Sequence, residues 1–183
     1  MNGNPESEAD ARIEIHAGDI TQLEVDAIVN AANAQLRPGG GVCGAIHRAA
    51  GRNLREACAR IGGCDTGDAV HTEGFDLKAK YVIHAVGPVW HGGRQNEAAL
   101  LASCYRTSLK VAKQIGARTI AFPAISTGIY GFPLESATQI AVATVRDFLA
   151  GDETIERVIF CVFGPEADAA YRRELGRRAA PGD

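Results

Sequence analysis

The sequence predicts an α/β fold in which a sheet is covered by helices on both faces. Short apolar runs alternate along the chain with longer segments of helical periodicity, and glycine, proline and asparagine gather between them. Strands that alternate with helices typically form parallel sheets with both faces buried. The length of 183 residues fits one domain with a sizeable core.

Six segments have the apolar or alternating pattern of strands. The first alternates between apolar and polar residues and is broken by Gly18-Asp19, whereas the second is a continuous apolar run typical of a buried strand. The predicted strands cover residues 12–17, 26–30, 69–73, 81–86, 119–123 and 157–163.

Five segments have helical periodicity. Gly51 separates the first two, and the last is amphipathic with basic residues near its end, where they suit the helix dipole. The predicted helices cover residues 42–50, 54–61, 97–115, 134–149 and 166–178. We expect residues 12–178 to form a single domain, residues 1–11 to be a disordered lead-in and residues 179–183 to be a frayed tail.

The composition limits the classes of function that the chain can have. Hydrophobic residues make up 46% and charged residues 22% of the chain, and the formal net charge is −3, so nothing global indicates binding to nucleic acid or an anionic membrane. No apolar run is long enough to span a bilayer. The polar, acidic start is unlike a signal or transit peptide, and five irregularly spaced cysteines without a CxxC indicate reduced thiols. We therefore expect a cytoplasmic protein.

A glycine-rich stretch at residues 39–44 organises the chain, because it follows a predicted strand and opens directly into a helix. Glycine lets backbone N–H groups approach a ligand, and the start of a helix attracts anions. A second glycine-bearing loop, at residues 125–133, also lies between a strand and a helix. Both loops should open at one edge of the sheet, where together they fit a diphosphate. The alternative is two unrelated turns.

Two familiar nucleotide motifs fit poorly. Gly39, Gly41 and Gly44 match the spacing of the dinucleotide fingerprint, but residues 31–38 intervene between the strand and the first glycine. A P-loop is excluded, because no Gly-Lys-Ser/Thr ending supplies a lysine and a hydroxyl.

Four further residues are candidates for ligand contacts. Asp19 could accept a hydrogen bond from an exocyclic amine such as that of adenine, or could simply cap a turn. Phe163 could stack on a base, although the residues alone favour a core aromatic. The Asn33 amide could hold sugar hydroxyls, or could fill a turn. Tyr130, between two glycines, could form a wall of the site.

Cys43 and His47 lie four residues apart on a predicted helix and share a face. They could supply two zinc ligands, but nothing nearby in the sequence supplies the others. Cys43 at a helix start is also a candidate nucleophile, although no base is identifiable. His16 and His84 fall in predicted strands and are interpreted as structural.

Several motifs together resemble a macrodomain of the MacroD-like class. The resemblance covers about residues 13–171, with the motifs in the same order. They are Gly18-Asp19-Ile20-Thr21, the segment 25–33, Gly39-Gly40-Gly41-Val42, the segment 45–51, Val86-Gly87-Pro88-Val89-Trp90 and the segment 122–133.

The resemblance implies a three-layer α/β/α fold with a mixed, mostly parallel sheet and a cleft for ADP-ribose. Asp19 and Ile20 would contact the adenine, Phe163 would flank it, and Asn33 would bind the distal ribose. The two glycine loops would wrap the diphosphate and distal ribose. The implied ADP-ribose contacts are Asp19, Ile20, Asn33, Gly40, Gly41, Val42, Cys43, Gly44, Ile46, Ser126, Thr127, Gly128, Ile129, Tyr130 and Phe163, with Asn33, Cys43 and Tyr130 as the catalytic candidates.

Members of this class remove the acetyl group from O-acetyl-ADP-ribose, or mono-ADP-ribose from acidic side chains of proteins, without a metal or other cofactor. In many of them Asp follows Gly-Gly-Gly-Val and is proposed to activate water, whereas this chain has Cys43, and Pro38 replaces a further glycine. The resemblance therefore implies a hydrolase, with a non-catalytic ADP-ribose reader as the alternative. We expect a monomer whose partners are ADP-ribose, O-acetyl-ADP-ribose and ADP-ribosylated proteins, and not membranes or nucleic acid.

Overall fold

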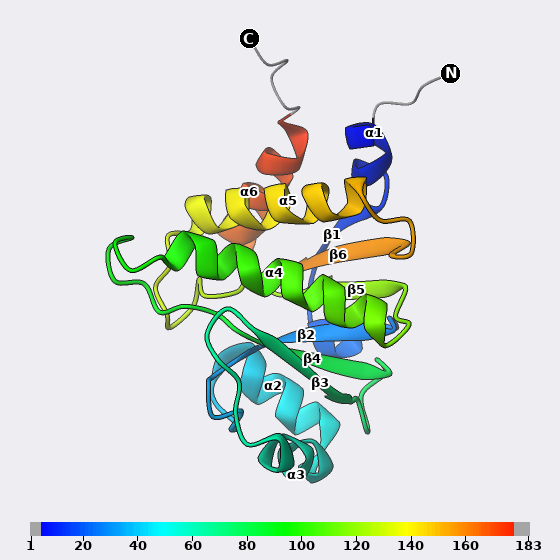
Figure 1. Ribbon diagram of the computed structural model, residues 1–183, viewed down its shortest axis with the longest axis vertical. Coiled ribbons are helices and arrows are strands. Elements are labelled where there is room, and N and C mark those ends of the chain that lie inside the picture. Colours follow the sequence, from blue (N-terminus) through cyan, green and yellow to red (C-terminus); the bar gives the residue numbers. More distant parts are fainter. Residues whose placement is uncertain (1–4, 178–183) are drawn as a thin grey trace.

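Six strands form one mixed sheet at the centre of the computed structural model, which describes residues 5–177. The strand order is β1-β6-β5-β2-β4-β3 (Figure 1). All neighbouring strands are parallel except β3, which runs antiparallel to β4 at one edge. The strands are β1 Ile13–Ala17, β2 Ala27–Ala32, β3 Ala69–Glu73, β4 Tyr81–Val86, β5 Thr119–Phe122 and β6 Arg157–Val162. The predicted α/β sheet is confirmed.

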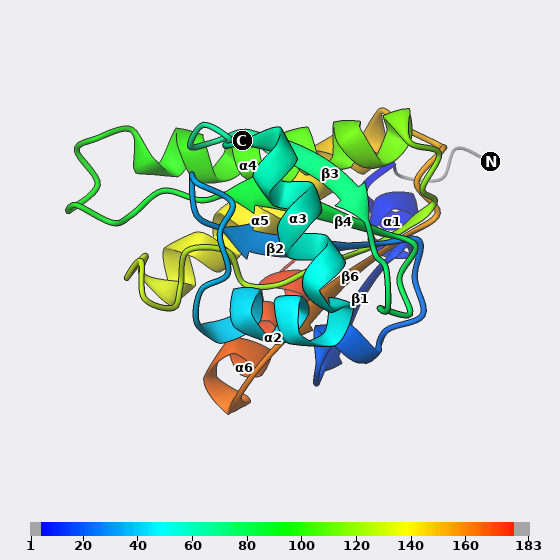
Figure 2. The same ribbon diagram turned by 90° about the horizontal axis from the view of Figure 1, so that it is seen from below.

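Helices cover both faces of the sheet and make a three-layer α/β/α arrangement. Helices α2 and α3, with the short 3-10 helix η1, pack on one face, and α1, α4, α5 and α6 pack on the other (Figure 2). The helices are α1 Pro5–Asp10, η1 Ile20–Gln22, α2 Gly41–Ala50, α3 Arg52–Ile61, α4 Glu97–Gln114, α5 Leu134–Ala150 and α6 Pro165–Gly176.

The side-chain alternation of the strands divides the core in two. In β2, Ala27 and Val29 face α4 and α5, whereas Ile28 and Ala32 face α2 and α3. Because successive side chains of a strand point to opposite faces, a central strand buried on both sides must be largely apolar, and Asn30 is the polar exception in β2. This requirement explains the continuous apolar runs that predict the strands.

The N-terminal prediction was wrong over residues 5–10, which form α1 rather than a disordered lead-in. Ala9 is fully buried in the core, and the guanidinium of Arg146 on α5 binds the Asp10 carboxylate at 2.6 and 3.0 Å. The helix is thus held by contacts with a segment far along the chain, which local composition does not reveal. The rest of the predicted lead-in, residues 1–4, and the predicted tail, residues 179–183, lie outside the described residues.

Five parallel strands place their carboxyl ends at the same edge of the sheet, at the left in Figure 1. The segments that leave these ends include Gly18-Asp19, the loop 33–40, Gly87, the loop 123–133 and Phe163. Ligands of open α/β sheets bind at this edge. Within residues 5–177, no helix has both the length and the apolarity to cross a membrane.

Candidate functional site

A cleft of about 730 Å³ opens at the carboxyl edge of the sheet, and five segments line it. Its volume lies within the range of sites that enclose a nucleotide-sized ligand. The lining residues are Gly18, Asp19, Ile20, Ala31, Ala32, Asn33, Gly39, Gly40, Gly41, Val42, Cys43, Ala45, Gly87, Pro123, Ala124, Ile125, Ser126, Thr127, Gly128, Ile129, Tyr130, Cys161, Phe163 and Ala167. The two glycine loops therefore meet at one site, as the sequence predicts.

One end of the cleft is formed by Asp19 and Ile20. The Asp19 carboxylate caps η1, and its Oδ1 accepts hydrogen bonds from the backbone N–H of Thr21 at 2.9 Å and from the Thr21 hydroxyl at 2.7 Å. These bonds fix the carboxylate but leave Oδ2 free for a donor in the cleft. Asp19 is exposed, whereas Ile20 is buried beside it. The capping and ligand-binding interpretations of Asp19 are thus compatible.

Two large apolar side chains are almost fully exposed on the rims of the cleft. Phe163 is 91% exposed and Ile129 is 92% exposed. The residues alone favour Phe163 as a core aromatic, and this interpretation was wrong because the strand ends at Val162 and the ring falls beyond the core. An aromatic ring left in solvent at a cleft is available to stack on a flat ligand.

The glycine-rich loop presents the start of α2 to the cleft. Gly40 is the N-cap residue, no side chain caps it, and no acidic residue occupies the first turn. The first N–H groups of the helix therefore lack side-chain partners and carry the positive end of its dipole. Gly41 has φ of +55°, which suits glycine. This arrangement has the features that attract an anion to the start of a helix.

Gly44 and Ile46, two of the expected contacts, are not among the residues that line the cleft. Ile46 is fully buried in the core between α2 and the sheet. Gly44 lies beneath the loop, its N–H donates to the Gly40 carbonyl at 3.2 Å, and a Cβ on it would clash with the Gly39 carbonyl oxygen. Gly44 therefore supports the loop from behind, because only glycine permits so close an approach.

The second loop is held in an unusual backbone conformation. Ser126 has φ of +66°, although it is not glycine, and its backbone carbonyl accepts a hydrogen bond from the Phe132 N–H at 2.9 Å. The Ser126 hydroxyl is buried and has no hydrogen-bond partner among the described residues. Strained backbone and an unsatisfied polar atom are features that concentrate at functional sites. Gly87 leaves no room for a side chain beside this serine.

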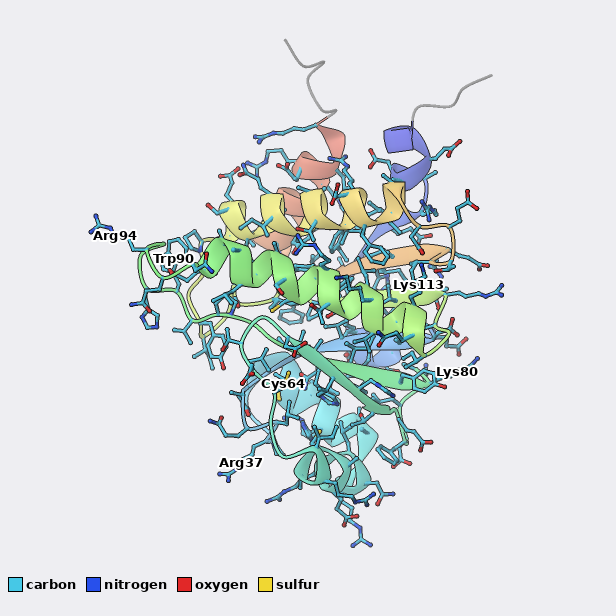
Figure 3. All side chains as sticks on the ribbon, in the orientation of Figure 1. Arg37, Cys64, Lys80, Trp90, Arg94 and Lys113 are labelled. Atoms are coloured by element: carbon cyan, nitrogen blue, oxygen red, sulfur yellow. The ribbon has the colours of Figure 1, made fainter. Side chains whose placement is uncertain are left out.

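Asn33 and Cys43 both bind the backbone of Arg37. The Asn33 amide donates to the Arg37 carbonyl at 2.8 Å and accepts from its N–H at 3.0 Å, and the Cys43 thiol lies 3.7 Å from the same carbonyl oxygen. The Arg37 side chain extends into solvent at the rim (Figure 3). Both side chains thus brace the loop that leads to Gly39, and the Cys43 S–H is already occupied as a donor.

A buried polar network lies beneath the cleft. The Asn30 amide nitrogen lies 3.7 Å from the Cys43 sulfur and 3.1 Å from His84 Nδ1. The Thr72 hydroxyl donates to a backbone carbonyl at 3.0 Å, so it accepts from His84 Nε2–H, also at 3.0 Å, and Nδ1 accepts from Asn30. Asn30 lies within β2 rather than in a turn, although turns are where asparagine is common. No local signal reveals this network, because its residues come from different elements.

His84 is neutral in the folded protein. Its side chain is fully buried, and burial, with the nearby His47 and His71 charges, lowers its pKa from 6.5 to about 3. The structural interpretation of His84 is therefore consistent with its surroundings.

We predict that His84 makes the protein less stable in acid. Between pH 6.5 and about pH 3 the unfolded chain binds a proton on His84 that the folded protein does not. The free energy of unfolding therefore falls with falling pH, by up to about 1.4 kcal/mol per pH unit from this residue alone. Urea unfolding at pH 7.0 and 5.0 should show a smaller loss for His84→Gln than for the unmodified protein. Equal losses in both proteins would contradict the assignment.

Cys43 and His47 share a face of α2, but within residues 5–177 no group of three His, Cys, Asp or Glu side chains is placed to hold a metal ion. Burial lowers the pKa of His47, and Arg55 contributes to the same shift. His47 Nδ1 is buried without a partner among the described residues and does not line the cleft.

Most of the predicted contact residues are brought together, and the structure adds others. All of them except Gly44 and Ile46 line the cleft. The additional lining residues are mostly small or apolar, as a strand end or a close approach to a ligand requires, and such residues carry no chemical signal in a sequence. Gly87 is an example, because only the structure shows that it makes room for Ser126.

The fold and the cleft define a class of α/β/α domains in which two glycine-bearing loops line a cleft at the carboxyl edge of the sheet. A family model described as Macro domain matches residues 29–141. The chain is 61% identical over 163 residues to a macro domain-containing protein of Chlorobaculum tepidum, with 88% of this chain and 95% of the relative covered. The chain therefore belongs to the macrodomain family.

Other relatives carry functional names. An O-acetyl-ADP-ribose deacetylase of Klebsiella pneumoniae is 55% identical, with 88% of this chain and 95% of that protein covered. Solved macrodomain structures from Oceanobacillus iheyensis with ADP and from Trypanosoma brucei with ADP-ribose match with TM-scores of 0.86 and 0.88. Their sequence identities are 39% and 41%, and the matches cover 89% and 94% of this chain, and 89% and 73% of those chains.

Proposed function

We propose that this chain is an ADP-ribose-binding hydrolase that removes acetyl from O-acetyl-ADP-ribose, mono-ADP-ribose from acidic side chains of proteins, or both. The observation that carries the proposal is the meeting of two glycine-bearing loops across one cleft of about 730 Å³. A relative 55% identical over 166 residues bears the name O-acetyl-ADP-ribose deacetylase, which supports the same chemistry.

The proposed ligand follows the cleft from Asp19 to Tyr130. Asp19 Oδ2 accepts from the adenine amine, and the exposed Phe163 ring covers the base. The N–H groups at the start of α2 and in the first part of the loop 126–130 bind the diphosphate, as helix starts bind anions elsewhere. Tyr130, at the end of this loop, lies beside the distal ribose. Asn33 donates its second amide hydrogen to a distal ribose hydroxyl, since its other amide hydrogen is held by the Arg37 carbonyl.

The proposed reaction needs a positioned water more than a strong base. In the deacetylation, water attacks the acyl carbon of the ester, the bond from that carbon to the ribose oxygen breaks, and the ribose oxygen takes up a proton as acetate is released. On a modified protein, water attacks the anomeric carbon of the distal ribose, and the protein carboxylate is the leaving group. The Cys43 thiol donates to the Arg37 carbonyl and accepts from Asn30, so we assign it a positioning role. The ligand's own phosphate and Asn33 orient the water, because a well-positioned reactant lowers the barrier by itself.

A second candidate is an ADP-ribose reader that binds without turnover. The observation that favours it is Cys43, a cysteine at the position where the resemblance places a water-activating Asp. A thiol is a weaker hydrogen-bond acceptor than a carboxylate and holds water less well.

The partners and location follow from the same proposal. We propose that ADP-ribosylated proteins reach the cleft from solvent, and that the chain acts as a monomer in the cytoplasm. All five cysteines are free, which fits a reducing compartment.

We expect the unmodified protein to release acetate from O-acetyl-ADP-ribose, or ADP-ribose from an acidic side chain of a modified protein. Asp19→Ala should raise KM about tenfold and leave kcat nearly unchanged, because the carboxylate contacts only the adenine end. Chromatography of the ADP-ribose product measures the turnover of both substrates.

Asp68→Ala is a matched control, because the Asp68 carboxylate also accepts a backbone N–H, at 2.8 Å from Ala69, but does not line the cleft. KM should stay unchanged in this variant. ADP-ribose binding without turnover of either substrate would favour the reader over the hydrolase.

A further inference from the structure

A buried carboxylate organises the exposed loop that follows Trp90. Glu97, in the first turn of α4, is 2% exposed, and its Oε2 accepts hydrogen bonds from the backbone N–H groups of His91 at 3.1 Å and Gly93 at 2.7 Å. Its Oε1 accepts from the Gln95 N–H. Hydrogen bonds to an ionised acceptor are the stronger kind. Three such hydrogen bonds, from every second residue of the loop, hold the loop around the Glu97 side chain.

The backbone of this loop is not one that an unassisted chain adopts readily. Gly92 and Gly93 have φ of +87° and +86°, and Asn96 has φ of +64°. Left-handed conformations cost little for glycine but more for other residues. The Glu97 carboxylate offsets this cost, because it binds the N–H groups that the conformation turns inward.

The loop is connected to the wall of the cleft through Trp90. Gly93 packs on the Trp90 ring, and a Cβ on Gly93 would lie only 3.0 Å from the ring. The ring packs against Phe132 with centroids 4.7 Å apart, and the Trp90 backbone N–H donates to the Tyr130 carbonyl at 2.8 Å. Figure 3 shows Trp90 at the base of this projection and Arg94 at its tip.

Tyr130 lines the cleft between Gly128 and Gly131, and a Cβ at either glycine would contact nothing within 4 Å among the described residues. The Trp90 N–H is therefore an external support for this part of the wall. A shift of the Glu97 loop would move Trp90 and, through it, the Tyr130 backbone.

We infer that Glu97 is a positioning residue for Tyr130. Through Tyr130 it determines how much more tightly the cleft binds ADP-ribose, which has the distal ribose, than ADP, which lacks it. The inference rests on the proposed function, which places Tyr130 beside the distal ribose. Asp19 and Phe163 lie on other segments, so replacing Glu97 should leave the contacts at the adenine end unchanged.

The test is titration calorimetry with ADP-ribose and with ADP on the unmodified protein and on Glu97→Gln. The amide keeps the side-chain size but removes the charge and one acceptor. We expect the Kd for ADP-ribose to rise about tenfold, as small displacements at a reacting centre can cause, and the Kd for ADP to change less than about twofold.

Asp152→Asn is the matched control. The Asp152 carboxylate is also buried and accepts the backbone N–H groups of Thr154 at 3.0 Å and Ile155 at 2.9 Å, but it precedes β6 at the opposite edge of the sheet. Both variants should lower Tm, whereas only Glu97→Gln should change the ratio of the two Kd values. A purely structural role for Glu97 would weaken both ligands equally and would overturn the inference.

Gly93→Ala gives a second route if Glu97→Gln fails to fold. It leaves the carboxylate in place and displaces the Trp90 ring, so it should cause the same selective loss of ADP-ribose affinity. An unchanged ratio in this variant also overturns the inference. Failure of the unmodified protein to bind either ligand would instead refute the proposed function.

Discussion

Gly44→Ala should abolish measurable ADP-ribose binding while the protein remains folded. A Cβ at this position would clash with the Gly39 carbonyl oxygen, and it would lie only 3.0 Å from the Arg48 guanidinium. A backbone carbonyl cannot rotate away as a flexible side chain can, so the glycine-rich loop must move. Its N–H groups then no longer point toward the ligand. We expect Kd to rise at least about a hundredfold and the free energy of unfolding to fall by about 1–3 kcal/mol.

Gly176→Ala serves as the control for this substitution. Gly176 ends α6 away from the cleft, and a Cβ added to it would have no contact within 4 Å among residues 5–177. The same added methyl group should leave ADP-ribose affinity unchanged. If Gly44→Ala bound ADP-ribose as tightly as the unmodified protein, the glycine-rich loop would not be the anion site.

Cys43→Asp should raise turnover of O-acetyl-ADP-ribose about a hundredfold, the lower end of what a positioned general base contributes. The Asn30 amide already donates toward this position, and the start of α2 favours a negative charge. A carboxylate there can accept a proton from water, whereas the thiol is committed to the Arg37 carbonyl. Single-turnover kinetics at saturating substrate separate this effect from binding.

Cys43→Ala distinguishes a positioning thiol from a reactive one. We expect its turnover to stay within about fivefold of the unmodified protein, because the two hydrogen bonds of the thiol are weak and a loss of about 1 kcal/mol corresponds to about that factor. A thiol that acted as base or nucleophile would instead lose nearly all activity on this substitution. That result would contradict the positioning role and restore Cys43 as a chemical participant.

The strands and the meeting of the two glycine loops could be predicted from the sequence because both follow from local rules. A strand buried on both faces must be largely apolar, as β2 and β4 are apart from Asn30 and His84, and parallel strands place their carboxyl ends at one edge. Loops that leave those ends therefore lie along the same edge of the sheet, whatever the strand order. The cleft at residues 39–43 and 126–130 could therefore be located without knowing the strand order.

The features that could not be predicted from the sequence depend on contacts between distant segments or on the exact end of a strand. Helix α1 is held by Arg146, and the Asn30–His84–Thr72 network joins three strands, so neither leaves a local pattern. Phe163 belongs to the core by its residue type, but it lies one residue beyond β6, where the core has ended. An aromatic residue at a strand end can be assigned only when that end is known to within one residue.

The central claim is that the cleft binds ADP-ribose, and titration calorimetry of the unmodified protein with ADP-ribose tests it most directly. We predict one binding site with a Kd in the low micromolar range, equivalent to a binding free energy of about −8 kcal/mol. Phe163→Ala should weaken this affinity, since the 91% exposed ring is otherwise without a function. The absence of binding heat at about 1 mM ligand, where a site of even millimolar Kd would be half filled, would contradict the account.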